Sequence, residues 1–418
     1  MDKIRIQGPC RLHGKVRVSG AKNAVLPELA AMLLVEGPVS LRNVPVVRDV
    51  QTMIKVLRHL GMRDVTLDGG TLRAEGGAPG EPEAPYDLVR TMRASILVLG
   101  PLLARLGRAK VSLPGGCAIG ARPIDYHIEA LRRMGAEIAI EHGYVVASCA
   151  RLKGAEIVFD DRTVTGTENL MMAAALADGR TVLKGCALEP EVVDLARFLN
   201  ACGARIEGAG TGRIVIEGVK HLHGAEHTVI PDRIETGTFL MAAAATRSGI
   251  TIERCDAGHL ESVLDKLQEC GVALRVDGDA IAVQPDGSLR AANVTTRPYP
   301  DFPTDLQAQF MALMARAEGV SIINETVFEN RLMHVGELRR MGARIVVDGQ
   351  TAIVAGPAPL SGAQVMASDL RASACLIVAG LAADGETVIN RAYHIDRGYE
   401  RVETKLQGLG ARIERISG

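Results

Sequence analysis

Cys117 lies in a loop whose composition suits a reactive thiol. The segment 113–125 reads LPGGCAIGARPID, and its glycines allow unusual backbone dihedrals. Arg122 follows in the same loop, and a nearby cation favours the thiolate and tunes a cysteine for proton transfer. Most unpaired cysteines are instead small buried apolar groups. The loop therefore predicts a chemical role for Cys117, with a buried thiol as the alternative.

Polar residues at the starts of apolar stretches form a second candidate group. Six of them stand 14 residues before a glycine: Asn23, Arg93, Thr165, Glu235, Asp305 and Arg371. Uncharged polar and acidic residues cap helices and suit the dipole there, so we expect Thr165 and Glu235 to be caps. An arginine is opposed by the same dipole unless an anion intervenes. Arg93 and Arg371, with the neighbouring Lys22, therefore indicate a bound phosphate or carboxylate.

Two arginines stand in comparable loops of different parts of the chain. Arg397 lies in NRAYHIDRGYERVE at a place that resembles the position of Arg122. Either one alone could be a surface ion pair that contributes little. Together with Lys22 they predict a cationic cleft between two domains, which suits a phosphorylated carboxylate.

These residues are positioned by six copies of one unit. A phrase like "LGARI" recurs about every 70 residues, with its glycine at Gly61, Gly135, Gly203, Gly271, Gly342 and Gly410. Each unit is predicted to contain helix, strand, helix, strand and strand. Most first helices are apolar nearly all round, so we expect them to be buried on every side. Six units divide into two domains of three, with a boundary near residues 225–232, and the leading strand, expected within residues 3–19, is left unassigned.

Composition excludes several classes of protein. The net charge is −1, no basic run occurs, and we expect no nucleic-acid partner. No apolar run reaches the length of a membrane span and the first residues lack a signal peptide's apolar core, so a cytoplasmic protein with no membrane contact is expected. The eight cysteines form no CxxC pair, and we expect no metal. Repeat positions predict that Cys202 and Cys270 are core residues, and apolar flanks predict the same of Cys375.

Eight motifs resemble one family over the whole chain. They are SGAKN (19–23), RTMRAS (90–95), LPGGCAIGARPID (113–125), PDRIETGTF (231–239), FPTDLQAQF (302–310), ETVFENRLMHV (325–335), SDLRAS (368–373) and YHIDRGYE (393–400). The chain resembles the UDP-N-acetylglucosamine 1-carboxyvinyltransferases, enolpyruvyl transferases of early peptidoglycan synthesis within the EPSP synthase family. The resemblance implies an α/β fold of two pseudo-threefold domains, each an inside-out α/β barrel of three repeated units, with the active site in the cleft between them. It places residues 1–20 and 230–418 in one domain and 21–229 in the other.

The resemblance also assigns roles to residues. It implies that Cys117 is the proton donor and forms a covalent adduct with phosphoenolpyruvate, and that Asp305 is the general base. Phosphoenolpyruvate is expected to bind Lys22, Asn23, Arg122 and Arg397, with Lys22 and Arg397 counted as catalytic. The residues expected at the sugar nucleotide are Arg93, Arg122, Pro123, Ile124, Asp125, Tyr126, Asp305 and Val327. Asp369 and Arg371 are expected to support the reacting centre.

The implied reaction is an addition followed by an elimination, with no cofactor. The enolpyruvyl group of phosphoenolpyruvate moves to the 3-hydroxyl of UDP-N-acetylglucosamine and phosphate leaves. One segment departs from some members: residues 161–164 read DRTV, without the lysine that can accompany the uridine. The rival readings are a transferase acting on shikimate 3-phosphate, which lacks the cysteine, and a repeat-built clamp that only binds a partner.

Overall fold

The computed structural model describes residues 2–77, 80–90, 92–113, 124–284 and 288–417. The chain forms two compact units. The C-terminal unit contains the described residues up to Ser19 and from Pro231 onward, and the N-terminal unit contains those from Gly20 to Ile230. The chain therefore passes between the units near residues 19–20 and again near residues 230–231.

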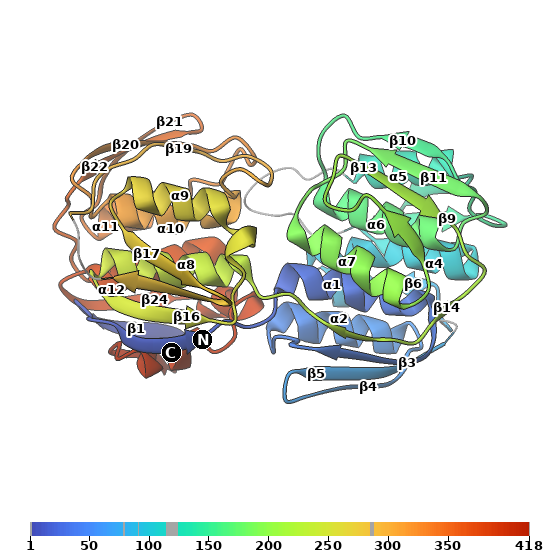
Figure 1. The fold of residues 1–418 in the computed structure, drawn as a ribbon, viewed down its shortest axis with the longest axis horizontal. Helices are drawn as coiled ribbons and strands as arrows, with labels where there is room; N and C mark the ends of the chain where they lie inside the picture. The colour runs from blue at the N-terminus through green and yellow to red at the C-terminus, as the bar shows by residue number, and fades with distance from the viewer. Residues whose placement is uncertain (1, 78–79, 91, 114–123, 285–287, 418) are drawn as a thin grey trace. The chain divides into compact units, whose positions relative to one another are not determined.

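The C-terminal unit surrounds three buried helices with sheets (Figure 1). Its central helices are α8 (Arg233–Ala245), α10 (Thr304–Met314) and α12 (Leu370–Ala382), which pack against one another. Its outer helices are α9 (Glu261–Glu269), α11 (Val335–Arg340) and α13 (Val402–Gly408), with 3-10 turns η3 (Ala257–His259) and η4 (Ala392–Arg397). Its strands are β1 (Lys3–Gly8), β2 (His13–Arg17), β16 (Gly249–Glu253), β17 (Ala273–Asp277), β18 (Ala280–Gln284), β19 (Val294–Thr295), β20 (Gly319–Asn324), β21 (Arg344–Asp348), β22 (Thr351–Gly356), β23 (Gln364–Met366), β24 (Gly385–Asn390) and β25 (Ile413–Ile416).

The N-terminal unit repeats this plan around α1, α4 and α6. Its helical segments are α1 (Lys22–Ala31), η1 (Met32–Leu34), α2 (Arg48–His59), α3 (Tyr86–Val89), η2 (Arg93–Val98), α4 (Leu99–Leu106), α5 (Asp125–Arg133), α6 (Val164–Ala175) and α7 (Pro190–Ala201). Its strands are β3 (Val35–Arg42), β4 (Arg63–Asp68), β5 (Thr71–Gly76), β6 (Glu83–Ala84), β7 (Arg108–Ser112), β8 (Glu137–Glu141), β9 (Tyr144–Ser148), β10 (Glu156–Val158), β11 (Arg180–Lys184), β12 (Arg205–Glu207), β13 (Arg213–Glu217), β14 (Leu222–His223) and β15 (Glu226–Thr228).

The repeat predicted from the sequence is confirmed in the backbone. The six glycines of the recurring phrase all have positive φ, between 87° and 98°, directly after the second helix of each repeat. Glycine adopts this left-handed conformation without the strain of a Cβ, which is why it recurs there. The apolar first helices are buried, as predicted, and so are Cys202, Cys270 and Cys375.

The predicted unit lacks one strand that the structure adds. Short strands β6, β10, β19 and β23 precede the first helices and pair in parallel with β7, β11, β20 and β24. The segment 3–19 holds two strands of different sheets: β1 lies between β24 and β25, and β2 pairs with β16. In the N-terminal unit β14 and β15 pair with β3. The predicted unit omitted the short strands β6, β10, β14, β15, β19 and β23 because two or three residues carry too little periodic pattern.

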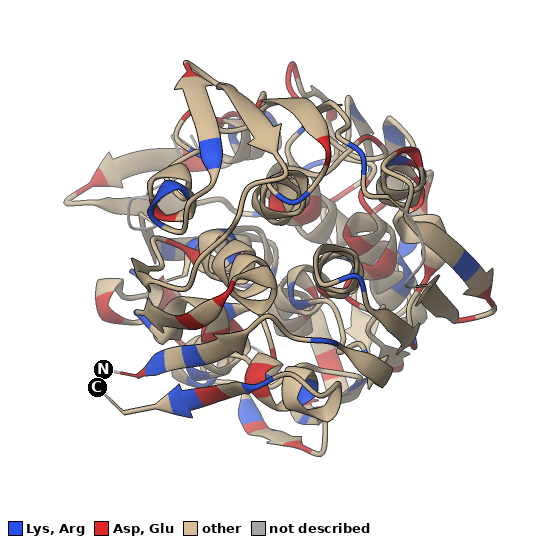
Figure 2. Ribbon diagram, turned by 90° about the vertical axis from the view of Figure 1, so that its left-hand side faces the viewer, with Lys and Arg blue, Asp and Glu red and all other residues tan. Residues whose placement is uncertain are grey.

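Charged residues of both signs are mixed along the chain, as the near-zero net charge indicates. Lys and Arg intermix with Asp and Glu along the ribbon (Figure 2). In the cross-strand ion pairs Lys15–Glu253 and Lys184–Glu156 at least the lysine is exposed to solvent, so each pair contributes little to stability. No helix within the described residues is both long enough and apolar enough to span a bilayer.

Candidate functional site

Asp305 is held between two guanidinium groups of the C-terminal unit. Its carboxylate lies 2.6 Å from Nη2 of Arg371 and 2.8 Å from Nη2 of Arg331. The Asp305 side chain is 26% exposed, whereas those of Arg371 and Arg331 are 8% and 4% exposed. Asp305 lies in the first turn of α10 and Arg371 lies in the first turn of α12, as the repeat predicts. The cluster therefore carries a surplus positive charge next to solvent.

These contacts fix the ionisation of the cluster. Burial opposes the charge of Asp305, but Arg371 and Arg331 hold the pKa of its carboxyl well below the usual range. Although burial disfavours the charge of Arg371, Asp305 and its other neighbours raise the pKa of that guanidinium. Asp305 is thus a carboxylate at any physiological pH, and a weak base in this state.

Arg371 pairs with an acid of the protein itself, and its contact with a bound anion stays a prediction. A carboxylate of the protein, Asp305, is the anion that offsets the unfavourable position of Arg371 at a helix start. Arg331 was not singled out by the sequence analysis, although it lies in the motif ETVFENRLMHV. Only the fold brings it to Asp305, from the segment after β20.

Helix capping also differs from the expectation. Thr163 accepts a hydrogen bond from the backbone N–H of Gly166, and Asp232 accepts from those of Ile234 and Glu235. Thr165 and Glu235 lie inside their helices, so neither is the cap. Oγ1 of Thr165 lies 3.4 Å from Nε2 of His127. A side chain in the first turn of a helix can contact residues of another helix, and the sequence alone does not identify that partner.

Glu235 belongs to a buried network at the first crossing of the chain. Its carboxylate accepts hydrogen bonds from the backbone N–H of Ser19 at 2.7 Å and from Lys405 Nζ at 2.6 Å. Ser19 Oγ donates to Glu400 Oε2 at 2.7 Å. These bonds tie the segment that precedes α1 to residues that follow Arg397 in the sequence.

The remaining predicted residues of this unit have structural partners too. Asp369 caps α12, because its Oδ1 accepts from the backbone N–H groups of Arg371 (2.8 Å) and Ala372 (3.1 Å). Val327 donates its backbone N–H to Glu325 Oε1 at 2.9 Å. Arg397 is the partly buried last residue of η4.

Lys22 begins α1 in the N-terminal unit and pairs with an acid of the next helix. Its Nζ lies 2.7 Å from Oδ2 of Asp49 in α2, and both side chains are mostly buried. Asn23 lies in the same turn and is partly buried. Asp49 was not predicted, since an acid in a first turn is common for reasons of the dipole alone.

Arg93 stands at the start of η2, near a buried histidine. Burial, with a further contribution from Arg93, lowers the pKa of His127 to about 4. Neutral His127 accepts a hydrogen bond at Nδ1 from the amide of Asn169, 2.8 Å away. Asn169 in turn accepts from the backbone N–H of Gly100 at 2.8 Å. This buried polar network joins α5, α6 and α4.

The predicted nucleotide segment is described only in part. Cys117, Arg122 and Pro123 lie outside the described residues. Ile124 is buried, and Asp125 is the exposed first residue of α5. The hydroxyl of Tyr126 donates to Oδ2 of Asp161 at 2.9 Å. The segment 161–164, which lacks the lysine found in some members of the family, thus has two structural roles. Asp161 binds the Tyr126 hydroxyl, and Thr163 caps α6.

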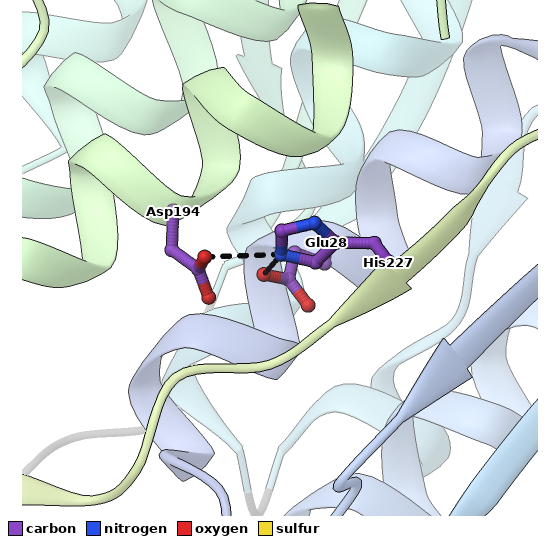
Figure 3. A group of neighbouring side chains, drawn as sticks. All are labelled: Glu28, Asp194 and His227. Atoms are coloured by element: carbon purple, nitrogen blue, oxygen red, sulfur yellow. Dashed lines mark hydrogen bonds and ion pairs between the residues drawn. The ribbon is translucent and has the colours of Figure 1, made fainter. Parts of the chain in front are cut away.

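A second charged cluster lies inside the N-terminal unit (Figure 3). Nε2 of His227, from β15, lies 3.0 Å from Oδ1 of Asp194 in α7 and 3.3 Å from Oε1 of Glu28 in α1. Burial raises the pKa of the Glu28 carboxyl to about 8. Burial opposes the charge of His227, but the hydrogen bond that it donates to Asp194 and its interaction with Glu28 raise its pKa to about 10. At neutral pH a protonated imidazole and a protonated Glu28 leave this cluster without net charge.

The same three residues are the ones that could hold a metal ion. Among the described residues, they are the group of His, Asp and Glu whose ligand atoms lie within 4.8 Å of one another. A divalent ion would have to displace both protons and enter a site where Glu28 and Asp194 are buried. Nε2 of His227 lies at hydrogen-bond distance from Oδ1 of Asp194, whereas neither carboxylate oxygen of Glu28 has a hydrogen-bond partner among the described residues.

Comparisons with known proteins identify the fold. The family model of EPSP synthase (3-phosphoshikimate 1-carboxyvinyltransferase) matches residues 6–406. A UDP-N-acetylglucosamine 1-carboxyvinyltransferase of Koribacter versatilis (strain Ellin345) is 57% identical over 422 aligned residues, covering 100% of this chain and 97% of that protein.

Solved structures agree with this assignment. The enolpyruvyl transferase NikO from Streptomyces tendae is 29% identical, with a TM-score of 0.89 and coverage of 100% of this chain and 99% of NikO. An EPSP synthase from Acinetobacter baumannii matches over 100% of both chains with a TM-score of 0.76 at 18% identity, which shows the shared fold alone. The predicted α/β fold of two domains with three repeated units each is thereby confirmed.

Proposed function

The chain belongs to the EPSP synthase family of carboxyvinyltransferases, and from that premise we propose that it transfers the enolpyruvyl group of phosphoenolpyruvate to the 3-hydroxyl of UDP-N-acetylglucosamine, releasing phosphate. The observation that carries the proposal is the 57% identity, over the full chain, to a UDP-N-acetylglucosamine 1-carboxyvinyltransferase. The reaction would be the first committed step of peptidoglycan synthesis. We place the reaction in the cytoplasm.

The proposed chemistry assigns the first step to Cys117 and Asp305. Cys117 donates a proton to the methylene carbon of phosphoenolpyruvate, while the sugar hydroxyl forms a bond to the adjacent, now electrophilic carbon. Asp305 accepts the hydroxyl proton. Its low pKa makes it a weak base toward a free alcohol, but the oxygen becomes strongly acidic as the new C–O bond forms. A weak, always ionised base therefore suffices late in the addition.

Elimination then breaks the bond between carbon and the phosphate oxygen. The methyl group of the tetrahedral intermediate returns a proton to the Cys117 thiolate as phosphate departs, which restores the double bond and the thiol. Lys22, Arg122 and Arg397 would stabilise the charge that develops on the phosphate, often a large catalytic contribution. Asn23 would contact phosphoenolpyruvate, while Arg93, Pro123 to Tyr126, Val327 and Asp305 would hold the nucleotide sugar. The residue assignments rest on the matching motifs.

One experiment separates this proposal from its rival. Phosphate release from phosphoenolpyruvate is measured with UDP-N-acetylglucosamine or shikimate 3-phosphate as acceptor, for the wild type and for Cys117→Ser. We expect release only with the nucleotide sugar, and a severe loss at neutral pH in the variant. Release only with shikimate 3-phosphate, the substrate named by the family model, would reverse the assignment. No release with either acceptor would indicate a binding protein.

An alkylation test examines Cys117 separately. Fosfomycin, an epoxide, is expected to block wild-type turnover and to add its mass to Cys117. Cys117→Asp should retain some activity and escape alkylation, because a carboxyl donates a proton but replaces the thiol poorly as a nucleophile. Full alkylation of Cys117→Asp would contradict the role given to this thiol.

A further inference from the structure

The hydroxyl of Tyr399 lies where the three central helices of the C-terminal unit meet. It is 2.7 Å from Oγ1 of Thr238 in α8, 3.3 Å from Nε2 of Gln309 in α10 and 3.5 Å from Nη1 of Arg371 in α12. Tyr399 is only 3% exposed. A single phenol oxygen thus contacts every central helix of the unit.

The direction of the hydrogen bonds follows from Thr238. Its hydroxyl donates to the carbonyl oxygen of Ile234 at 2.8 Å, so Oγ1 accepts the proton of Tyr399. The lone pairs of the phenol oxygen are then left for the amide of Gln309 and the guanidinium of Arg371. A tyrosine hydroxyl can donate once and accept twice, and this arrangement uses that capacity.

The phenol oxygen of Tyr399 lies beside one of the two terminal nitrogens of the Arg371 guanidinium. Nη1 faces Tyr399, while Nη2 holds Asp305 at 2.6 Å. A guanidinium is planar, so fixing one arm sets the direction of the other. Gln309, the second partner of the phenol, also donates to the backbone carbonyl of Asp305 at 3.1 Å. Two paths therefore lead from the Tyr399 hydroxyl to Asp305.

We propose that Tyr399 is a positioning residue for the transfer reaction, and that its hydroxyl aligns Arg371 and thereby the carboxylate of Asp305. The proposal deepens the proposed function and rests on it. Tyr399 is not a proton donor to substrate in this view, because it is buried and burial raises the pKa of its phenol. It acts through Arg371.

The same tyrosine fixes the segment that carries Arg397. The backbone N–H of Tyr399 donates to the carbonyl of Ile395 at 3.0 Å. Gly398, between Arg397 and Tyr399, lies against α12 so closely that an added Cβ would be 2.7 Å from Cδ2 of Leu370. Tyr399 therefore anchors its own segment and Arg371 at the same point of the fold.

The test compares substitutions that remove one hydroxyl each. Tyr399→Phe and Thr238→Val keep the side-chain shape, and Thr238→Ser keeps the hydroxyl. The matched control is Thr387→Val in β24, because Thr387 is buried in the same unit and its hydroxyl has no hydrogen-bond partner among the residues described. Each variant is assayed for kcat, KM and melting temperature with phosphoenolpyruvate and UDP-N-acetylglucosamine.

We expect Tyr399→Phe and Thr238→Val each to lower kcat about tenfold, since small misplacements of reacting groups can cost up to about 100-fold. KM for the nucleotide sugar should change less than about twofold, because the contacts to bound sugar are kept. The double variant should be no slower than either single one, because both break the same chain of hydrogen bonds. Thr238→Ser and Thr387→Val should retain wild-type kcat.

A pH profile separates positioning from packing. When Arg371 is no longer held against it, Asp305 loses part of the stabilisation of its charge, and its pKa rises. The acid limb of kcat should therefore move to higher pH in Tyr399→Phe and stay in place in Thr387→Val. A residue that only packs would lower the melting temperature without moving that limb.

The outcomes are distinguishable from failure of the proposed function itself. If the wild type releases no phosphate with UDP-N-acetylglucosamine, the function is wrong. If the wild type turns over and both hydroxyl-deletion variants keep its kcat, the positioning role is overturned. It is equally overturned if Thr387→Val loses as much kcat as they do, or if the double variant shows independent, multiplied losses.

Discussion

Two clusters of buried charge, one in each unit, have opposite surpluses. In the C-terminal unit two guanidiniums surround one carboxylate, Asp305, whose pKa is lowered. In the N-terminal unit two carboxyls surround one imidazole, His227, and the pKa values of His227 and Glu28 are raised. The first cluster stays ionised and has a partly exposed carboxylate, whereas the second holds protons and is mostly buried.

This difference shows how ion pairs with similar distances serve different purposes. Arginine keeps its proton, so the Asp305 cluster cannot neutralise itself and retains a positive surplus next to solvent. Carboxyls and imidazole can exchange protons, so the Glu28 cluster removes its own surplus charge. The first arrangement suits binding and chemistry on anions, and the second suits the joining of α1, α7 and β15.

The largest expected effect is on catalysis. Asp305→Asn should lower kcat by roughly 100- to 10,000-fold, the usual contribution of a general base. Asp194→Asn, in the other cluster, should leave kcat within about twofold while lowering the melting temperature, because it disturbs a structural group. The comparison is made by phosphate release at a temperature where both variants are folded. Asp301→Asn, an exposed neighbour of Asp305, is the control. Equal losses of kcat in Asp305→Asn and Asp194→Asn would contradict the assignment of a catalytic role to one cluster and a structural role to the other.

The next effect is on stability. His227→Leu removes the only cation of its cluster and leaves Glu28 and Asp194 without a shared partner, so we expect a loss of about 3–5 kcal/mol in the free energy of unfolding. Urea denaturation measures it. His223→Leu, on the neighbouring strand, is exposed and should change stability by less than about 0.5 kcal/mol. A His227→Leu variant as stable as the wild type would show that the ion pairs contribute nothing.

The pH dependence of stability should have opposite signs in the two clusters. The pKa of His227 rises on folding from 6.5 to about 10, so its contribution is fully present below pH 6.5 and is lost as the pH rises through about 10. Asp305 has a lowered pKa, so its contribution is present above pH 3.8 and lost only in stronger acid. Melting temperatures between pH 7 and 10 should fall in the wild type and fall less in His227→Leu. Parallel curves would contradict the assignment of His227.

The smallest effect is expected for Glu28→Gln. The folded pKa of Glu28 is about 8, so the group is mainly protonated at pH 7 and an amide is a close replacement. We expect a change of less than about 1 kcal/mol at pH 6. Because the raised pKa makes wild-type stability decline between pH 4.5 and 8, the variant should decline less over that range. Chemical denaturation at several pH values checks this, and an unchanged slope would mean that Glu28 is ionised in the folded state.

The sequence by itself determined the features that depend on local pattern. Glycine at Gly61 and its five repeats predicted the left-handed helix ends, because only glycine adopts that conformation without strain. Apolar periodicity predicted the buried central helices, and the equal spacing placed Asp305 and Arg371 in corresponding first turns. The motifs around these positions were enough for the resemblance that the comparisons confirmed.

Only the tertiary structure decided which charges meet. Arg331 reaches Asp305, Lys405 reaches Glu235, and His227 reaches Glu28 across 199 residues of chain. Nothing local distinguishes such a side chain from a solvated surface charge, because its partner comes from another element. The short strands that complete the sheets could not be predicted from the sequence for the same reason. A strand of two residues is defined by the strand that it pairs with and not by its own pattern. Burial, and with it the pKa values, followed from those pairings.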